Sequence, residues 1–405
     1  MRDGWIETSL GEIADVVGGG TPSTKIGEYW DGDIVWLTPT EITSQDGKVV
    51  SDSIRKITDL GFKNSGAQML PINSVILTSR ASVGFVALSG KELCTNQGFQ
   101  SLIPKPSVLS KFIMFWIQQN RSEFESRSAG STFKEISKSN VKSIKILLPP
   151  LPEQKRIVDL ISSVDSYIDA LQQQLERAKK SRNAVLYELL TQSGEDWVET
   201  TLGEAAEVIM GRQLSPSKKL GTRPRPYIRA ANIGSWGINL EDIYEMDFTE
   251  IEEERFACQV GDTILVEGGN EKSVGCPALI TETESGLCIQ NTVIRSRSKN
   301  SKVLDPNFQY HLLRFMFWRG DFAQLCAGTT IMHLGQKRAE VVPISIPPLK
   351  EQLNIVDTIS KFDSAVNYSE KTLNSARSLR SGLLSDLLSG KHEIPASYDK
   401  VMGAA

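Results

Sequence analysis

The chain has 405 residues, enough for two or three domains that each bury a core. Its formal net charge of −4 does not exclude a nucleic-acid partner, because residues 215–229 carry five basic and no acidic residues. No apolar run reaches the length of about 20 residues that a membrane helix needs. Five scattered cysteines without a CxxC pair indicate a reduced, cytoplasmic chain, so we expect no membrane partner.

Residues 1–148 are predicted to form an α/β body. The runs 34–37 and 74–77 are short, rich in β-branched residues and bounded by Gly, Asn or Pro, which is typical of strands. Around 112–117 the apolar spacing becomes helical. We therefore expect a twisted sheet with helices packed on it.

Residues 149–192 open with PPLPEQ and are predicted to form a long helix. The proline pair at 149–150 favours extended backbone, Pro152 suits a first helical turn, and Glu153 faces the positive end of the helix dipole. Apolar residues then follow a 4-3 spacing that is typical of a coiled coil. This seam consists of Ile157, Ile161, Val164, Ile168, Leu171, Leu175, Ala178, Arg182, Val185 and Leu189.

Residues 193–346 repeat the frame of the first body. The opening WIETSLGE at Trp5 returns as WVETTLGE at Trp197, and the SVG and AGS/TT segments also recur, while the sequences between them diverge. Two copies are too few for a solenoid, so a pseudo-twofold arrangement is expected. A second α/β body is therefore predicted over this range.

Residues 347–391 repeat the long helix, and residues 392–405 form a tail. Residues 148–190 and 346–388 share 18 identities in 43 positions. The second seam consists of Ile355, Ile359, Phe362, Val366, Ser369, Leu373, Ala376, Arg380, Leu383 and Leu387. The matched Arg182 and Arg380 favour an antiparallel coiled coil, because a polar seam residue fixes register. Two separate amphipathic helices are the alternative.

A search for catalytic motifs finds none that is convincing. There is no phosphate-binding GxxxxGK[ST], no GxGxxG and no [DNS]PP[YF] loop of an amino-methyltransferase. The three histidines, His311, His333 and His392, lack metal-ligand spacing, so no metal site is predicted. His311 lies in an apolar stretch and is interpreted as structural, whereas His333 is open to a contact role or a structural one.

Two variable bodies, each followed by PPL-x-EQ and a long helix, resemble the specificity subunit of type I restriction–modification systems. The resemblance spans essentially the whole chain and rests on both WxxxxLGE openings, both PPL-x-EQ helices and the AGS/TT segments. The second copy departs from the first at Lys350, where the first has Pro152, and at Ser369, where the first has Leu171. Helix start and seam packing are therefore expected to be weaker there.

The resemblance implies a non-catalytic subunit that binds double-stranded DNA. Each target-recognition domain would read one half of a split asymmetric sequence, and the two helices would act as a spacer and dock two methyltransferase subunits. Those partners would carry S-adenosylmethionine, and restriction/translocase subunits would use ATP and Mg²⁺, so no cofactor is expected in this chain.

The resemblance does not fix the DNA-contact residues, so candidates rest on chemistry and position. Arg pairs with guanine and Asn with adenine in the major groove, and Lys contacts phosphates. A structural loop role is the alternative for each. The candidates are Arg80, Ser82, Ser131, Thr132, Lys134 and Lys138 in the first body, and Arg225, Arg229, Asn232, Asn270, Lys272, Ser273, Thr329, Thr330 and His333 in the second.

Lys134, Lys138, Lys142 and Lys145 could also form one helical stripe along a phosphate backbone, or an ordinary solvated face. Two other functions stay open. One is a nuclease or a fused methyltransferase, which would nick or methylate DNA without partners. The other is a structural adaptor, which would leave no footprint on duplex DNA.

Overall fold

The computed structural model describes residues 4–130, 134–191, 194–214, 222–234, 237–326 and 331–401. The chain divides by its contacts into two units, and each unit contains one body and one half of each long helix. Unit 1 comprises Met1–Gln173 with Lys371–Ala405, and unit 2 comprises Gln174–Glu370. The sequence segments predicted at 1–148, 149–192, 193–346, 347–391 and 392–405 follow the elements along the chain, whereas this division cuts through both helices.

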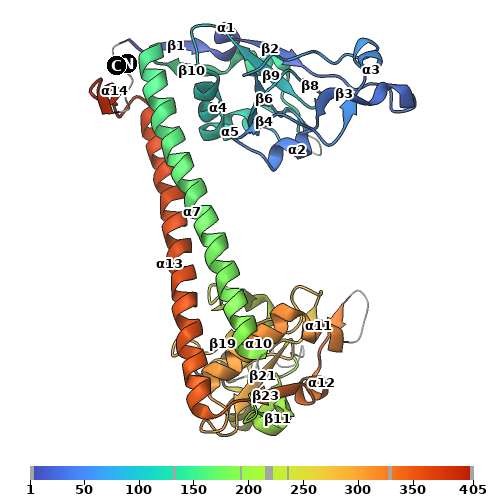
Figure 1. Ribbon diagram of the computed structural model, residues 1–405, viewed down its shortest axis with the longest axis vertical. Helices are drawn as coiled ribbons and strands as arrows, with labels where there is room; N and C mark the ends of the chain where they lie inside the picture. The colour runs from blue at the N-terminus through green and yellow to red at the C-terminus, as the bar shows by residue number, and fades with distance from the viewer. Residues whose placement is uncertain are drawn as a thin grey trace. The chain divides into compact units, whose positions relative to one another are not determined.

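The body of unit 1 is a mixed α/β fold (Figure 1). Its five-stranded sheet has the order β2 (Ala14–Gly18), β9 (Gln100–Pro104), β6 (Val75–Leu77), β7 (Val86–Ser89) and β4 (Val49–Val50). A second sheet has the order β5 (Lys56–Ile57), β3 (Trp30–Leu37) and β8 (Cys94–Thr95), and β1 (Ile6–Ser9) pairs with β10 (Lys145–Leu148). The helices are α1 (Leu10–Ile13), α2 (Pro39–Thr43), α3 (Asp59–Lys63), α4 (Ser110–Gln119), α5 (Arg121–Ser126) and α6 (Lys138–Ser143).

The body of unit 2 repeats this plan. Its main sheet has the order β12 (Ala206–Met210), β21 (Val293–Ser298), β17 (Thr263–Val266) and β19 (Pro277–Leu279), and a second has β16 (Tyr244–Asp247), β13 (Pro224–Ile228) and β20 (Cys288–Ile289). Three strand pairs join β11 (Val198–Thr201) to β23 (Pro343–Ile346), β14 (Ile233–Gly234) to β15 (Gly237–Ile238), and β18 (Gly268–Gly269) to β22 (Met332–His333). The helices are α8 (Leu202–Ala205), α9 (Glu250–Phe256), α10 (Pro306–Arg319), α11 (Asp321–Leu325) and α12 (Gln336–Glu340).

The strands predicted at 34–37 and 74–77 fall in β3 and β6, and the helical stretch predicted at 112–117 falls in α4. The α/β fold class is thus confirmed. The lysine stripe is wrong as one helical face: Lys138 and Lys142 lie on α6, but Lys134 precedes that helix and Lys145 begins β10. A short helix bounded by a loop and a strand cannot carry all four.

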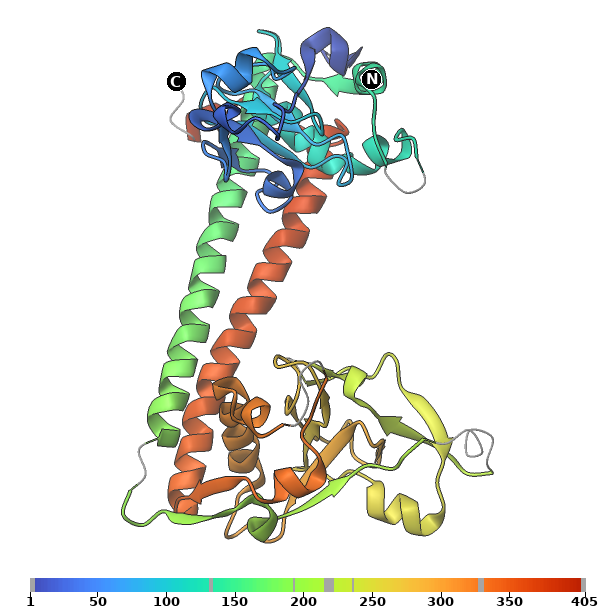
Figure 2. The same ribbon diagram turned by 90° about the vertical axis from the view of Figure 1, so that its right-hand side faces the viewer.

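The two long helices are α7 (Leu151–Thr191) and α13 (Leu349–Leu388), and they lie side by side (Figures 1 and 2). Every predicted seam residue of both helices is buried or half-buried. In unit 1, Arg380 pairs with Asp165 and Arg377 donates to Gln172. Residue 165 of α7 pairs with residue 380 of α13, and residue 172 pairs with residue 377. Residue numbers therefore rise along one helix while they fall along the other, so the pairing is antiparallel.

Unit 2 repeats this antiparallel pairing with its own residues. Lys179 lies 2.9 Å from Glu370, and Arg182 lies 3.6 Å from Asp363. The seam arginines of the two copies therefore meet carboxylates at matched positions, Asp165 and Asp363, 198 residues apart. Both seam arginines thus make cross-helix contacts of the kind that can fix register.

The second helix begins as regularly as the first, despite Lys350 and Ser369. Both helices start at the leucine of PPL, and Ser369 is buried with its hydroxyl donating to Ala365 O at 2.9 Å. Because the hydroxyl is satisfied within its own helix, the seam accepts it.

The PPL-x-EQ glutamine joins each helix to its own body. Gln154 is fully buried; its Oε1 accepts from Leu109 N–H at 2.9 Å, and its Nε2 donates to Ser107 O at 3.1 Å and Pro149 O at 2.9 Å. Gln352 repeats the same three bonds to its own loop, each at 2.8 Å. The repeated phrase is thus a clamp between helix and body.

The neighbouring glutamate meets the other repeated motif. Trp5 donates from Nε1 to Glu153 at 2.9 Å, and Trp197 donates to Glu351 at 3.2 Å. The WxxxxLGE opening and the PPL-x-EQ phrase are therefore in contact in both units. The two motifs recur together because they form one junction between body and helix in each unit.

The core of unit 1 is completed by residues from both helices and from the segment after α13. Ile157 and Ile161 of α7 join it, together with Leu384 and Leu387 of α13 and Ile394 beyond that helix. Farther along the chain, α14 (Tyr398–Val401) begins, and Arg156 pairs with Asp399 at 3.2 Å. The predicted tail at 392–405 thus contributes to unit 1. In unit 2, Leu186, Leu190, Ile355 and Ile359 occupy corresponding places in the core.

Candidate nucleic-acid interface

Three loops of unit 1 are joined in one hydrogen-bonded row, which we call the three-loop edge. It comprises residues 79–84 after β6, residues 96–98 after β8, and residues 134–136 before α6. Ser79 N–H donates to Gly98 O at 2.7 Å, and Ile136 N–H donates to Ser79 O at 3.0 Å. The first loop therefore lies between the other two.

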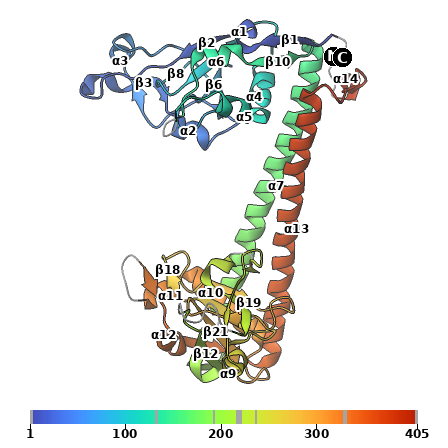
Figure 3. The same ribbon diagram turned by 180° about the vertical axis from the view of Figure 1, so that it is seen from behind.

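Unit 2 builds the same edge from residues 267–274, which contain β18 (Figure 3), from residues 290–292 and from residues 332–334. Glu267 N–H donates to Thr292 O at 2.9 Å, and Leu334 N–H donates to Glu267 O at 2.8 Å. The central residue is a serine in one unit and a glutamate in the other. The backbone row is therefore shared although the side chains differ.

A glycine holds the middle loop in each unit. A Cβ on Gly19 would lie 2.0 Å from Asn96 O, and a Cβ on Gly211 would lie 2.3 Å from Gln290 O. The next residues, Gly20 and Arg212, each donate a backbone N–H at 2.9 Å, to the carbonyls of Thr95 and Ile289. Only glycine permits this approach, which sets the height of the loop.

The described DNA-contact candidates of unit 1 gather on the three-loop edge. Arg80 is exposed and pairs with Glu135 at 2.9 Å, and Ser82 N–H donates to Arg80 O at 2.7 Å. Between them Ala81 has a φ of +59° and donates its N–H to Lys134 O at 3.2 Å. This conformation is uncommon for alanine and fixes the path of the loop. Lys138 is exposed at the start of α6. Ser131 and Thr132 lie outside the described residues.

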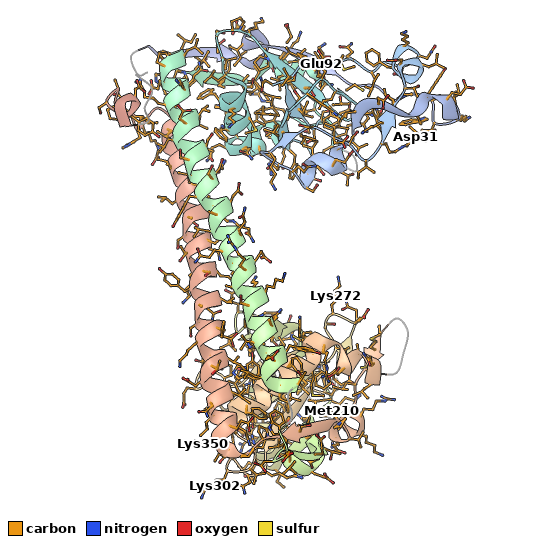
Figure 4. All side chains as sticks on the ribbon, in the orientation of Figure 1. Asp31, Glu92, Met210, Lys272, Lys302 and Lys350 are labelled. Atoms are coloured by element: carbon orange, nitrogen blue, oxygen red, sulfur yellow. The ribbon has the colours of Figure 1, made fainter. Side chains whose placement is uncertain are left out.

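The corresponding candidates of unit 2 also meet. Asn270 and Ser273 form a turn in which Asn270 N–H donates to the Ser273 hydroxyl at 3.0 Å. Lys272 in the same loop is exposed (Figure 4). Gly268 of β18 lies opposite His333 of β22 in an antiparallel strand pair. The Nδ1 atom of His333 lies 3.1 Å from Glu267 Oε2. Thr329 and Thr330 lie outside the described residues.

The three candidates at 225, 229 and 232 are engaged within unit 2. Arg225 pairs with Glu253 at 2.6 Å, and Arg229 pairs with Asp242 and lies over the ring of Tyr244. Asn232 is 2% exposed; its Oδ1 accepts from Arg229 N–H and its Nδ2 donates to two carbonyls. In this structure Asn232 therefore supports its own loop.

Two hollows lie along the three-loop edge of unit 2. One, of about 430 Å³, is lined by residues including Glu267, Asn270, Thr292 and His333. The other, of about 480 Å³, is lined by residues including Lys272 and Ser273. Both hollows include Ala230 and Gly268 in their walls. Polar groups from all three loops thus line connected concave surface, which suits the edges of a nucleic acid.

Sequence reasoning missed the middle loop of each edge. Both copies contain a Leu-Cys pair, at 93–94 and at 287–288, which we call the Leu-Cys echo. Asn96 and Gln97 follow it in the first copy, and Gln290 and Asn291 follow it in the second. All four are exposed or half-exposed. Reading two residues past each echo would have found two consecutive amides in both copies.

The described residues also bear on metal binding, on membrane crossing and on the titration of buried side chains. No group of three or more His, Cys, Asp or Glu residues that could hold a metal ion occurs in the ranges given above. No described helix has both the length and the apolar stretch that a membrane crossing requires. The five cysteines are free, and burial raises the pKa of Cys94 to about 12 and of Cys288 to about 11. Burial lowers the pKa of His311 to about 3, with a further contribution from Arg314.

Comparison with known proteins identifies the family. The model of the type I restriction modification DNA specificity domain matches residues 2–180 and again residues 194–376. The specificity subunit of the type I restriction enzyme MjaIX from Methanocaldococcus jannaschii is 27% identical, covering 96% of this chain and 93% of the relative. That of EcoKI from Escherichia coli K12 is 22% identical over 96% of this chain and 88% of the relative.

Solved structures agree on the fold. A chain from a structure on complex assembly and conformational transition of the type I R-M system matches with a TM-score of 0.66 and 18% identity, covering 96% of this chain and 98% of that one. The S subunit from M. genitalium matches with a TM-score of 0.55 and 16% identity, over 96% and 97% of the two chains. The chain therefore belongs to the type I restriction–modification DNA specificity family, as a specificity subunit with two target-recognition domains.

Proposed function

We propose that each body reads one half of a bipartite, asymmetric DNA target, and that α7 and α13 set the spacing between the halves and dock two methyltransferase subunits. The observation that carries the first part is the three-loop edge. Its backbone row is the same in both units, while its side chains differ. A shared backbone gives a shared mode of approach to the duplex, and different side chains give different bases.

The charges of the edge support a nucleic-acid partner. Lys134, Lys138 and Lys272 are exposed on or beside it, and Arg80 is exposed although paired. A phosphate can replace Glu135 as the partner of Arg80 with little loss, because exposed ion pairs contribute less than about 1 kcal/mol. Lysines at the edge then position the duplex, and the net charge of the whole chain becomes unimportant.

A body exchange tests the division of labour. Residues 1–148 are replaced by the first body of a relative that carries the WxxxxLGE tryptophan, so that contacts to Glu153 and Gln154 are kept. The methylated motif of cells carrying the hybrid is then determined by sequencing. We expect one half of the motif to change and the other half and spacer to stay. A change in both halves, or in neither, contradicts the proposal.

The spacing role is tested by lengthening both helices together. Seven residues, one heptad, are inserted in α7 between Gln172 and Lys179 and in α13 between Glu370 and Arg377, which leaves the Arg377–Gln172 and Lys179–Glu370 pairs intact. Seven residues add about 10.5 Å of helix, so the spacer should lengthen by at most about three base pairs at 3.4 Å each. The control inserts the heptad in α7 alone, which breaks the pairing. An unchanged spacer with full activity contradicts the proposal.

Docking is supported by apolar residues left on the outside of the helices. Tyr167 is 56% exposed, Tyr368 is 73% exposed and Leu379 is 68% exposed. Contiguous exposed apolar patches mark protein contact sites, and we propose that these side chains contribute to such sites on the two helices. The basic run at 177–180, by contrast, is not wholly available to partners, because Lys179 pairs with Glu370.

Replacing Tyr167 and Tyr368 by glutamate should abolish co-purification with the methyltransferase subunit, while the melting temperature of the chain stays the same. Lys361→Glu, on an exposed side chain of α13, is the matched control. The methyltransferase subunits would bring S-adenosylmethionine, and the restriction/translocase subunits would bring ATP and Mg²⁺. Retained co-purification of the tyrosine variant would contradict docking at these faces.

A further inference from the structure

We propose that Gln97 and Asn291 are specificity-determining residues, each hydrogen-bonding to an adenine edge in the half-site read by its own unit. This inference rests on the proposed function and assigns a base to one residue of each three-loop edge. Neither residue stands out in the sequence, because the copies diverge around them. The structure matches them through the backbone bonds that their loops make.

The match between the two middle loops is fixed by geometry. Gly98 O accepts from Ser79 N–H in unit 1, and Thr292 O accepts from Glu267 N–H in unit 2, so 98 corresponds to 292. The two residues before each are therefore equivalent. They are Asn96 and Gln97 in the first copy and Gln290 and Asn291 in the second. Both loops carry two amides, in opposite order.

The first amide of each pair supports the loop. Asn96 Oδ1 accepts from Gly98 N–H at 2.8 Å, and Gln290 Oε1 accepts from the Thr292 hydroxyl at 2.9 Å. In both units this bond holds the residue whose carbonyl joins the three-loop edge. Because this bond lies within the middle loop itself, we assign the first amide to shaping the loop, whereas the oxygen of Gln97 accepts from Thr21 outside that loop.

The second amide of each pair is available to a ligand. Gln97 is exposed, and its Oε1 accepts from the Thr21 hydroxyl, which orients the carboxamide while leaving Nε2 and one lone pair. Asn291 is half-exposed, and its backbone N–H donates to Arg212 O at 3.0 Å. Within the part of the chain that the structure describes, the Asn291 carboxamide makes no hydrogen bond of its own.

Adenine is the base that fits a carboxamide. It offers an acceptor at N7 and a donor at N6 in the major groove, and Asn or Gln pairs with both. Guanine offers two acceptors there and cytosine a donor without an acceptor, so a carboxamide satisfies only part of either edge. Each unit therefore places one adenine-complementary group on its edge, beside the cations that hold phosphates.

The test compares the same charge change at adjacent residues. The variants Gln97→Glu and Asn291→Asp remove the donor from the proposed reading amide. Asn96→Asp and Gln290→Glu make the same change at the supporting amide and keep its acceptor oxygen. Each variant is purified with its methyltransferase partners and given the methyl donor and plasmid duplexes. In these duplexes the native target is randomised one position at a time, except at the methylated bases.

We expect Gln97→Glu to lower the preference for adenine at one position of one half-site by roughly 5- to 150-fold, the range for one bidentate base contact. The other half should be unchanged. Asn291→Asp should do the same in the opposite half, and Asn96→Asp and Gln290→Glu should keep the native preference. If the carboxylate variant does not assemble, Gln97→Met, which has a similar shape, repeats the comparison.

Two results would overturn the inference. One is a uniform fall in methylation with the base preferences intact, which would mark Gln97 as a backbone contact. The other is an equal effect of Gln97→Glu and Asn96→Asp, which would reduce the result to added charge. Altered preferences in both halves from one variant would instead overturn the division into half-sites, and so the proposed function beneath it.

Discussion

The interiors of the two units differ most along matched strands. The registers of β6 with β9 and of β17 with β21 place Val75 opposite Leu102 and Thr263 opposite Ser296. Counting from these pairs, Ser74, Ser101 and Ile103 of unit 1 correspond to Asp262, Arg295 and Arg297 of unit 2. In unit 2 Arg297 binds Asp262 through two bonds of 2.7 Å, and Arg295 donates to Glu207 at 2.7 Å. Unit 1 has hydroxyls and an apolar side chain there.

The junctions between body and helix show the opposite behaviour. The glutamine clamp and the tryptophan–glutamate bond recur in both units with the same partners. The two units thus differ in their interiors, which are apolar and hydroxyl-bearing in unit 1 and charged in unit 2, while the junctions share their chemistry. The contacts that join a body to the helices are the same in both copies. The side chains inside a body and on its three-loop edge differ between the copies.

The largest expected effect comes from breaking the charged interior. Asp262→Asn leaves the Arg295 guanidinium, with 2% of its side chain exposed, without its nearest buried carboxylate. Breaking a buried pair costs about 3–5 kcal/mol of unfolding free energy. Hydrogen exchange of β17 and β21 peptides, read by mass spectrometry, measures unit 2, and β6 and β9 peptides of unit 1 are the internal reference.

Ser74→Ala is the matched change in unit 1. Its hydroxyl donates to Pro71 O at 2.7 Å, so about 1 kcal/mol is expected. Equal losses in the two units would show that the charged interior of unit 2 is no more demanding than the hydroxyl interior of unit 1.

Matched substitutions at the junction between body and helix should destabilise the two units equally, unlike matched substitutions in their interiors. Gln154→Ala and Gln352→Ala each orphan one N–H and two carbonyls around a fully buried position. Each should lower the unfolding free energy of its own unit by about 3 kcal/mol, since unsatisfied buried groups cost about 1–3 kcal/mol each. Hydrogen exchange of α4 and α10 reports the two losses. A clear inequality would mean that the clamp matters in one unit only.

Acid should separate the units further. The folded-state pKa of His311, lowered to about 3 by burial, lies below the ordinary value of 6.5, so the unfolded chain binds the proton first as pH falls. The contribution of neutral His311 to the unfolding free energy is fully present above about pH 6.5. It decreases by about 1.4 kcal/mol per pH unit as the pH falls to about 3. At pH 5 unit 2 should have lost about 2 kcal/mol, measured by hydrogen exchange of α10 after correction for intrinsic rates. His311→Leu should remove this slope and leave that of unit 1 as it was.

The smallest effect belongs to the seam arginines. Arg182 and Arg380 have 24% and 21% of their side chains exposed, so replacing either by methionine should change stability by less than about 1 kcal/mol. The expected change is in register. Cysteines at positions 172 and 377 should form a single crosslink in the parent and a weaker, mixed pattern in Arg380→Met. An unaltered crosslinking pattern would assign the register to the apolar seam alone.

The sequence predicted the tandem plan, the helix starts and the α/β class because these depend on local spacing and on repeated motifs. It did not predict the clamp, since Gln154 contacts residues near 107–109 that carry no matching motif. It also missed Gln97 and Asn291, although each lies three residues after the cysteine of a shared Leu-Cys pair, because nothing in the surrounding residues marks a base contact. Asn232 looked like a base reader by residue type, but burial decided its role. The spacing of apolar residues does not predict which distant segments of the chain come into contact.

The closing of the unit 1 core by Leu384, Leu387 and Ile394 has a consequence for synthesis on the ribosome. Unit 2 is one continuous stretch, so all of its residues have been made before residue 371 is added. The first body is made earliest yet waits while residues 174–405 are added, which takes about 12–46 s at roughly 5–20 residues per second. During that interval the part of its core that Leu384, Leu387 and Ile394 complete has no cover from this chain. The body that is translated first therefore completes its core last. We expect chaperones to bind nascent chains in which the second body has already folded.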